Sequence, residues 1–270
     1  MVAKRTVKVA TPNRPPPQNL LLAALPAADR DRLQPLLDVI PLKLKGMLHR
    51  PGEAFDYVYF PAGGFCSVVT VLEDGSMVEV ATIGREGMVG VSAMIDGQPV
   101  VSATMVQGAA EVCYRMSAAS FRAEFDKRGA FYTLLARYSQ ALTDTIMQST
   151  ACNAVHSIEQ RLARWLLMAQ DRMGQAEFPL TQEFIAMMLG ATRPTVTVVA
   201  GSLQRAGLIS YRRGQVKVRN RAKLEAASCE CYRTATRVLR RVTNGSAPPT
   251  RQAARTSSVE TAKASARKRA

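Results

Sequence analysis

The 270-residue sequence predicts an α+β chain with three parts: an N-terminal antiparallel jelly-roll β-barrel, a long helix, and a C-terminal set of short helices with a hairpin. Three observations support this prediction. Short apolar runs separated by glycines extend from Val39 to Met116, which is typical of a barrel. A largely helical stretch follows from Ala118 to Met173, and two capped helices and a hairpin lie between Leu180 and Val218.

The first part begins after a Pro-rich basic arm with a short helix at about Asn19–Leu37. The strand-like runs that follow are Tyr57–Phe60, Cys66–Leu72 and Met77–Ile83. Glu73-Asp74-Gly75-Ser76 has the composition of a hairpin turn between the last two. A barrel of this kind can enclose a small ligand, and the alternative is a solid barrel that serves only as a dimer scaffold.

One Gly-rich turn of the expected barrel carries charge. Arg85 and Glu86 form a charged pair between Gly84 and Gly87, on an otherwise apolar turn. Functional polar groups often lie on loops, so these two residues are candidates for ligand contact, together with Gly87 and Val89. The alternative is the solvated tip of a hairpin.

The helical stretch contains a possible coiled-coil seam. Its residues recur at three- and four-residue spacing, and the candidate dimer interface is Leu135, Tyr138, Leu142, Thr145, Ser149 and Cys152. The second half of this seam is small and polar, so the barrels would have to assist pairing. A break near Asn153–Ser157 is expected to form a hinge, after which Ser157 caps a helix over Ile158–Met173.

The segment Leu180–Val196 has the pattern of a helix-turn-helix. Thr181 caps the first helix, Gly190 ends it, and Thr192 caps a second helix with Pro194 in its first turn. The second helix has one apolar face. Its opposite face, which carries Arg193, Thr195, Thr197 and Ser202, lacks large apolar groups. Such a face can enter a DNA major groove. Helix pairs around a Gly turn also occur in domains that bind no nucleic acid.

A basic hairpin follows and favours the nucleic-acid interpretation. Leu208–Val218 reads as two strands around a turn that contains Arg212, Arg213 and Gly214, which is typical of a wing. Residues 174–244 carry 12 Lys and Arg against four Asp and Glu, a net +8 within a chain of +15. Phosphate neutralisation supplies most non-specific DNA affinity. The candidate DNA-binding residues are Thr181, Thr192, Arg193, Thr195, Thr197, Arg212 and Arg213.

The five cysteines are dispersed and odd in number, which indicates free thiols in a reducing cytoplasm. Cys66 and Cys113 are expected to be buried in strands. Cys229 and Cys231, two apart in the last expected helix, would not share a face, so we expect no metal site, with a metal or redox role as the alternative. Leu20–Leu25 is too short to span a membrane. We find no nucleophile–base set, phosphate loop or dinucleotide fingerprint, so an enzyme is not expected.

In this order of parts, the sequence resembles the CRP/FNR superfamily of bacterial transcription regulators over about Leu20–Glu225. The motif that carries the resemblance is L-T-x-E-x-I-A-x-x-L-G, then x-x-R-x-T-V and L-x-x-x-G-L-I, with Gly52-Glu53, Tyr59-Phe60 and Gly87-Met88-Val89-Gly90 in the barrel. The resemblance implies a cytoplasmic homodimer that binds double-stranded DNA and acts with RNA polymerase. Arg193 would be its guanine-reading arginine, and Thr181, Thr192 and Thr195 would contact phosphates.

The departures from the family are informative. Members that bind cyclic nucleotides grip the phosphate with an arginine, whereas the corresponding stretch here, Val100–Ala103, begins with valine. Cyclic AMP is therefore not expected. The N-terminal arm lacks the cysteines of iron–sulfur members, and only His49 and His156 could ligate haem, with His49 expected to be exposed. The operator is expected to differ, because Pro194 and Val198 replace residues that familiar members use.

We accordingly expect a basic arm (1–19), a sensor barrel (20–117), a dimerisation helix and hinge (118–156), a winged helix-turn-helix domain (157–244) and a basic tail (245–270), with both tails disordered. The leading interpretation is a dimeric, sequence-specific regulator whose barrel senses a signal and repositions the DNA-binding domains. The alternative is a ligand-binding module that acts through protein contacts. The effector, the operator and the sign of regulation are left open.

Overall fold

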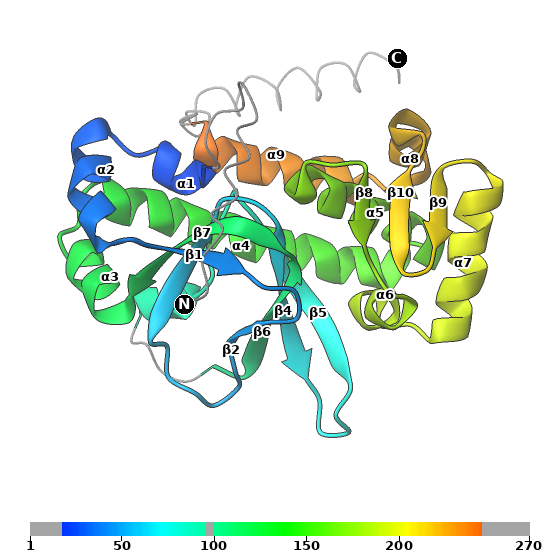
Figure 1. Ribbon diagram of the computed structural model, residues 1–270, viewed down its shortest axis with the longest axis horizontal. Coiled ribbons are helices and arrows are strands. Elements are labelled where there is room, and N and C mark those ends of the chain that lie inside the picture. Colours follow the sequence, from blue (N-terminus) through cyan, green and yellow to red (C-terminus); the bar gives the residue numbers. More distant parts are fainter. Residues whose placement is uncertain (1–17, 96–99, 245–270) are drawn as a thin grey trace, which may run out of the picture.

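The α+β architecture predicted from the sequence is confirmed by the computed structural model (Figure 1), which describes residues 18–95 and 100–244. The expected disorder of both tails concerns residues 1–17 and 245–270, which lie outside the described residues. At the edge of the N-terminal arm, Asn19 is buried. Its side-chain amide donates to the carbonyls of Pro61 and Gly87, at 2.9 and 2.8 Å. The arm therefore joins the fold just before residue 20.

The barrel consists of two antiparallel sheets that face each other. One has the order β1-β7-β3 and the other the order β2-β6-β4-β5. The strands are β1 (Asp38–Leu42), β2 (Met47–His49), β3 (Tyr57–Pro61), β4 (Phe65–Val71), β5 (Met77–Ile83), β6 (Ser102–Gly108) and β7 (Ala110–Ser117). Apolar side chains from both sheets fill the space between them, among them Leu42, Tyr59, Cys66, Val106 and Cys113. Burial of Cys66 and Cys113 confirms their expected place in strands.

Helices close the barrel at its ends. The expected helix over residues 19–37 is split into α1 (Leu20–Ala23), α2 (Ala27–Leu33) and the 3₁₀ turn η1 (Gln34–Leu36). Pro26 stands at the N-terminus of α2, where its ring and missing N–H prevent a continuous helix. A second 3₁₀ turn, η2 (Val91–Met94), follows the Gly84–Gly90 turn.

The long helical stretch contains three helices: α3 (Ala118–Phe125), α4 (Ala130–Val155) and α5 (Ile158–Met173). The predicted break between α4 and α5 is found at His156–Ser157. Ser157 and Gln160 form a reciprocal capping box that starts α5. The sequence did not predict the break between α3 and α4, where Arg128 adopts the left-handed conformation with φ of 56°.

The C-terminal part contains β8 (Glu177–Pro179), α6 (Gln182–Leu189), α7 (Arg193–Arg205), β9 (Ile209–Arg212), β10 (Gln215–Val218), α8 (Arg221–Ala227) and α9 (Cys231–Thr243). The two predicted strands are β9 and β10, and β8 pairs with β10 as a third strand. Within the described residues, no single helix is long and apolar enough to cross a membrane; α6 and α7 meet that test only as a bent pair, by length and composition.

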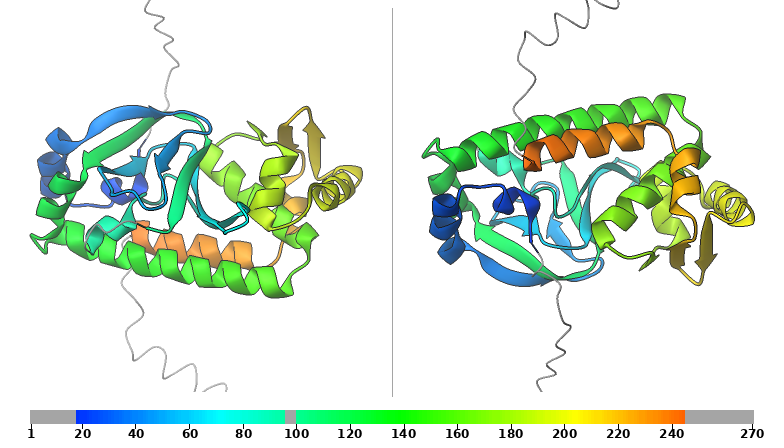
Figure 2. Two further views of the ribbon diagram at one scale, coloured as in Figure 1. Left: turned by 90° about the horizontal axis from the view of Figure 1, so that it is seen from below. Right: turned by 90° about the horizontal axis from the view of Figure 1, so that it is seen from above.

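Helix α9 leaves the helix-turn-helix and returns along α4, as both views in Figure 2 show. Val238, Leu239 and Val242 pack into the apolar cluster that joins α4 to the barrel. The last 13-residue helix of the expected DNA-binding domain therefore covers the long helix instead. The expected DNA-binding domain, residues 157–244, therefore includes a helix that packs along α4 of the preceding part.

This packing buries four of the six residues of the predicted dimer interface within their own chain. Leu135 and Tyr138 are buried against the barrel of their own chain, and the Tyr138 hydroxyl donates to the Met88 carbonyl at 3.1 Å. Thr145 and Cys152 are also buried, while Leu142 and Ser149 are partly buried. A seam at three- and four-residue spacing identifies the buried face of a helix, but it does not say whether the covering partner is a second copy or the same chain.

Helix α5 lies between the barrel and the helix-turn-helix. Every residue from Arg161 to Ala169 is buried. Phe65, Val69 and Ala103 of the barrel belong to the same apolar cluster as Leu166 and Val196. Burial of each large apolar side chain contributes about 1.5–3 kcal/mol. The two parts of the chain thus share one core.

A carboxyl group lies within this contact. Glu79 of β5 accepts hydrogen bonds from Ser67 of β4 and from the Trp165 indole of α5, the latter at 2.9 Å. Burial raises the pKa of Glu79 to about 7, although the two hydrogen bonds and the nearby Arg172 and Arg164 act in the opposite direction. The Glu79 carboxyl, which lies between the barrel and α5, therefore gains or loses a proton near neutral pH.

We predict that Glu79 makes the free energy of unfolding depend on pH. Because its pKa is higher in the folded state than in the unfolded chain, the folded state binds the extra proton, and stability decreases as pH rises from about 4.5 to about 7. Glu79→Gln should flatten the profile in this window, as measured by chemical denaturation. Asp74→Asn is the control, because the Asp74 pKa is lowered by hydrogen bonds from Ser76 and affects only more acidic conditions. A Glu79→Gln profile that parallels the unmodified chain would contradict the assignment.

Candidate nucleic-acid interface and its contact with the barrel

The helix-turn-helix forms as the sequence predicts. The Thr181 side chain accepts from the Phe184 N–H and Thr192 accepts from the Thr195 N–H, so each threonine caps the helix that follows it. Gly190 ends α6 in the left-handed conformation, with φ of 57°. The chain bends by 102° between α6 and α7, within the usual range for this motif.

The two faces of α7 differ as expected except at Val198, a large apolar residue that is 68% exposed. Val196, Ala200 and Leu203 are buried in the shared core. The Arg193 side chain is 64% exposed and forms an ion pair with Glu183 of α6, with Nη1 to Oε1 at 2.8 Å. Thr197 is also exposed, and its hydroxyl contacts the Gln182 side chain at 3.1 Å. Arg193 is thus on the surface, although a carboxylate accompanies it.

The wing lies beside these helices. Gln215 pairs with Arg212, so Arg213 and Gly214 form a two-residue hairpin loop, and their φ values of 50° and 72° are those of a type I′ turn. Arg212 and Arg213 are both exposed. The Leu180 N–H donates to the Gly214 carbonyl at 2.7 Å, which holds the turn next to the start of α6. The predicted DNA-binding residues are therefore brought to neighbouring positions.

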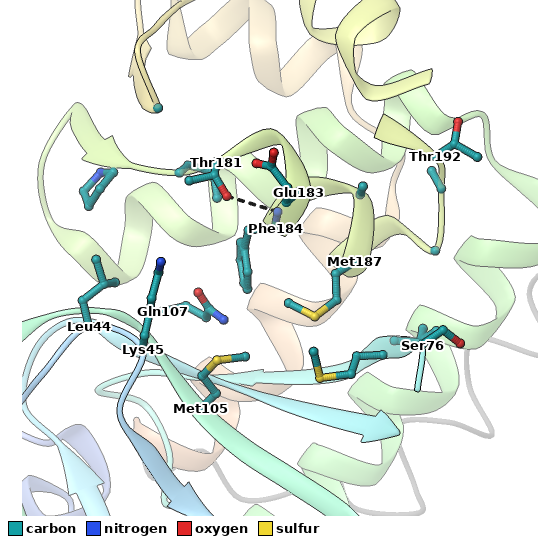
Figure 3. A pocket seen from close by; sticks show the side chains of 18 residues that line it. Leu44, Lys45, Ser76, Met105, Gln107, Thr181, Glu183, Phe184, Met187 and Thr192 are labelled. Atoms are coloured by element: carbon teal, nitrogen blue, oxygen red, sulfur yellow. Dashed lines mark hydrogen bonds between the residues drawn. The ribbon is translucent and has the colours of Figure 1, made fainter. Parts of the chain in front are cut away.

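A cavity of about 880 Å³ separates this surface from the barrel (Figure 3). The barrel contributes Met105, Gln107 and Ser76, and the helix-turn-helix contributes Phe184 and Met187. Thr181, Glu183, Thr192 and Gly214 also line the cavity. Sequence reasoning did not foresee that the candidate DNA-binding face would lie beside the barrel.

The Gly84–Val89 turn has a structural role that contradicts a free ligand-facing role for Glu86. The Glu86 carboxylate pairs with the nearly buried Arg172 of α5, with Oε1 to Nη2 at 2.7 Å. Arg172 also donates to the Thr82 carbonyl at 3.2 Å. A Cβ at Gly87 would stand 2.3 Å from the Tyr138 hydroxyl, so only glycine fits there.

The other two candidates of that turn differ in exposure, and only Arg85 lines a small cavity of about 190 Å³ together with Glu86. Val89 is buried, and its N–H and carbonyl pair with Tyr59. Arg85 is exposed, and its backbone carbonyl accepts from Leu20. The turn therefore attaches α1, α4 and α5 to the barrel.

The stretch that corresponds to the phosphate-binding arginine of cyclic-nucleotide members is Val100–Ala103. Val101 is 83% exposed just before β6, and no cation replaces the missing arginine at that position of the sequence. The expectation that His49 is exposed is wrong, because its ring is buried beside Phe55 and Tyr59, with Nε2 at 3.0 Å from the Tyr57 carbonyl.

The expectation that Cys229 and Cys231 lie in one helix is also wrong. Helix α8 ends at Ala227 and α9 begins at Cys231, so Cys229 lies in the break between the two helices and Cys231 is the first residue of α9. Cys152 and His156, at the end of α4, complete a compact group with them.

Comparison with known families agrees with this architecture. A profile of the cyclic nucleotide-binding domain matches residues 41–128, which contain strands β2 to β7 of the barrel and the end of β1. A profile of the Crp-like helix-turn-helix domain matches residues 160–227, from α5 to α8. Compared by sequence with curated proteins, the chain has no significant match.

Solved structures with similar folds include three regulators. A CRP-family transcriptional regulator from Thermus thermophilus is 21% identical, with a TM-score of 0.58 over 70% of this chain and 95% of that chain. A putative crp/fnr-family regulator from Eubacterium rectale is 19% identical, with a TM-score of 0.57 over 77% and 96%. The c-di-GMP-responsive global regulator CLP from Xanthomonas campestris is 17% identical, with a TM-score of 0.57 over 72% and 100%.

The likeness of these structures is a likeness of fold. The assignment of the family comes from the two domain profiles, which occur in the order barrel then helix-turn-helix and together match more than half of the chain. The chain belongs to the CRP/FNR superfamily of transcription regulators, which is not a family of enzymes.

Proposed function

We propose that the chain is a dimeric, sequence-specific regulator whose barrel receives a signal and thereby repositions the helix-turn-helix on DNA. The observation that carries this proposal is the surface formed by Arg193, Arg212 and Arg213, which are exposed on neighbouring elements of a helix-turn-helix with a wing. The N-terminal turn of α7 would read base edges, and the wing would contact the phosphate backbone. RNA polymerase is the partner expected of a regulator that acts at promoters.

The ion pair between Arg193 and Glu183 supports a reading role for the arginine. Both side chains are largely exposed, at 64% and 60%, so the pair contributes little to stability. A guanine offers its O6 and N7 atoms as acceptors to a bidentate arginine. Arg193 can therefore leave the exposed Glu183 carboxylate and bind these two guanine atoms instead. Glu183 would hold the guanidinium near α7 until DNA arrives.

The contact with the barrel supports repositioning. A cavity of about 880 Å³ has the size of a small-molecule site and is too small for a duplex. In Figure 3, Ser76 of the β4–β5 hairpin lies across the cavity from Thr192, the cap of α7. Glu73 and Asp74 at the tip of that hairpin would repel phosphates. DNA binding therefore requires the helix-turn-helix and the hairpin to separate.

The exposed face of α4 supports pairing with a second copy. Since α9 and the barrel cover the face that the sequence indicated, the available face is the opposite one. Its exposed residues recur at three- and four-residue spacing and are Ala136, Gln140, Thr143, Met147, Thr150 and Ala154. Most of these side chains are small, and Met147 is 63% exposed. Two such faces can approach closely and place two α7 helices on a two-fold site.

We predict that Arg193→Ala weakens binding to the preferred operator by about 1–3 kcal/mol and relaxes the preference at one base pair, because the bidentate contact with guanine is lost. The measurement is selection from a random DNA pool followed by affinity titration at fixed salt. Arg205→Ala, an exposed arginine at the other end of α7, is the control and should retain the preference. An unchanged sequence preference in Arg193→Ala would remove this residue from the reading surface.

We predict that neutralising the hairpin tip increases DNA affinity. Glu73→Gln with Asp74→Asn removes two charges beside the approach to α7, so binding should strengthen roughly severalfold at low salt and less at high salt. Glu111→Gln, an exposed acid on β7, is the matched control. Equal affinities of the hairpin variant and the control would show that the hairpin does not oppose DNA binding.

We predict that Met147→Glu raises the dimer dissociation constant by at least about tenfold, because two carboxylates would meet at the centre of the paired helices. Sedimentation equilibrium measures this change. Val39→Glu, on β1 and 62% exposed, is the control and should leave the constant unchanged. A stable dimer of Met147→Glu would place the interface elsewhere.

A further inference from the structure

Four potential metal ligands meet where the long helix ends. Cys152 and His156 lie one turn apart at the C-terminal end of α4, Cys229 lies in the break between α8 and α9, and Cys231 begins α9. The three cysteines are buried and form an isolated cluster, with His156 partly buried beside them. Two segments far apart in the sequence thus contribute to one group.

The spacing of these side chains suits a tetrahedral ion. One ligand atom from each residue can be chosen so that all four lie within 4.8 Å of one another. The Cys152 and Cys229 sulfurs are 3.5 Å apart, and the Cys231 sulfur is 3.6 Å from His156 Nδ1. A zinc–sulfur bond of about 2.3 Å requires sulfurs about 3.8 Å apart in a tetrahedron. Small shifts of the side chains would therefore complete the geometry.

The groups around the cluster resemble the supporting partners of a metal site. His156 Nε2 lies 3.3 Å from a Glu230 carboxylate oxygen, which leaves Nδ1 directed at Cys231. A carboxylate on the second ring nitrogen orients a histidine ligand and increases its basicity. The Gln148 amide donates to the Cys231 sulfur at 3.1 Å, as amides do to bound thiolates.

Two buried arginines lie next to the cluster, and one of them, Arg164, also interacts electrostatically with the Glu79 carboxyl. Arg161 and Arg164 of α5 are 9% and 7% exposed, and no ion pair of either is found among the described residues. The Nε atoms of both lack a hydrogen-bond acceptor there. Both interact electrostatically with the Cys152 sulfur. Three thiolates and one divalent ion carry a net charge of −1, which would offset this buried positive charge.

We propose that Cys152, His156, Cys229 and Cys231 form a Cys₃His site for Zn²⁺. Thiolate and imidazole ligands in a closed tetrahedron select zinc and leave no position for a substrate, so the site would be structural. The ion would fasten the α4–α5 hinge to the α8–α9 break. The site does not depend on the DNA-binding proposal, and the tests below do not use DNA.

The first test is the metal content of the untagged full-length chain, purified anaerobically. Elemental analysis should find about one zinc per chain. Replacement by Co²⁺ should produce the visible absorption of a tetrahedral ion and the near-ultraviolet absorption of sulfur–cobalt bonds. Chelation should lower the melting temperature by at least about 5 °C, and Zn²⁺ alone, but not Mg²⁺, should restore it.

Variants distinguish this site from adventitious binding. Cys229→Ser and Cys231→Ser should each bind Zn²⁺ at least about tenfold more weakly and alter the Co²⁺ spectrum. His156→Gln should retain the near-ultraviolet sulfur–cobalt absorption but change the visible absorption, because one ligand of the ion is lost. Cys66→Ala and Cys113→Ala are the matched controls in the barrel and should bind as the unmodified chain does. Circular dichroism verifies that each variant is folded.

Three results would overturn the proposal. The first is a zinc content far below one per chain that added Zn²⁺ does not raise. The second is a Co²⁺ spectrum that Cys229→Ser and Cys231→Ser leave unchanged. The third is a disulfide between Cys152 and Cys229 in the anaerobically isolated chain, which would assign the pair to redox chemistry. The metal content of the unmodified chain decides the question even if a variant fails to fold.

Discussion

The burial of α5 on all sides is the constraint on which the rest of the structure depends. One side of this helix packs on the outer face of the β2-β6-β4-β5 sheet through Trp165 and Phe65, and another packs on α6 and α7. Under the proposed function, a helix in this position would transmit a displacement of the barrel to the helix-turn-helix. It also makes separation costly, because Leu162, Trp165 and Leu166 would each lose buried apolar area.

Polar contacts fix α5 at both ends. At the C-terminal end, Arg172 is held by Glu86 and by the Thr82 carbonyl of the barrel. At the N-terminal end, Arg161 donates to the Leu189 carbonyl of α6 and lies beside the cysteine–histidine cluster. Apolar packing tolerates small sliding movements, whereas these directional contacts hold one register. They determine where a movement of the helix-turn-helix can begin.

The sequence predicted the local structure well and the long-range packing less well. Caps and glycine stops are local signals, so Thr181, Gly190, Thr192 and Ser157 indicated their helix ends correctly. The buried face of α4 was also visible in its periodicity, but periodicity does not identify the partner that covers a face. The return of α9 along α4 and the Glu86–Arg172 pair join residues distant in sequence, and a single sequence carries no signal for either. For the cysteine–histidine cluster a signal did exist: a cysteine and a histidine four residues apart at a helix end, and a pair of cysteines two residues apart.

The arrangement of charge and packing suggests how a signal could act. The Arg172 and Arg161 contacts lie toward opposite ends of α5, so a change confined to the barrel acts first on the C-terminal contact, while the N-terminal contact keeps α5 and α6 together. The helix-turn-helix would then move as one unit with α5, and the cavity beside Thr181 and Thr192 would open without any change within the DNA-reading motif. The Glu79 carboxyl of β5 accepts a hydrogen bond from Trp165 on the face of α5 that packs on the barrel. Its protonation would therefore contribute to the equilibrium between the closed and the open arrangement. In the mechanism proposed above, the barrel would need only to alter this contact to control the exposure of a DNA-binding surface that is already formed.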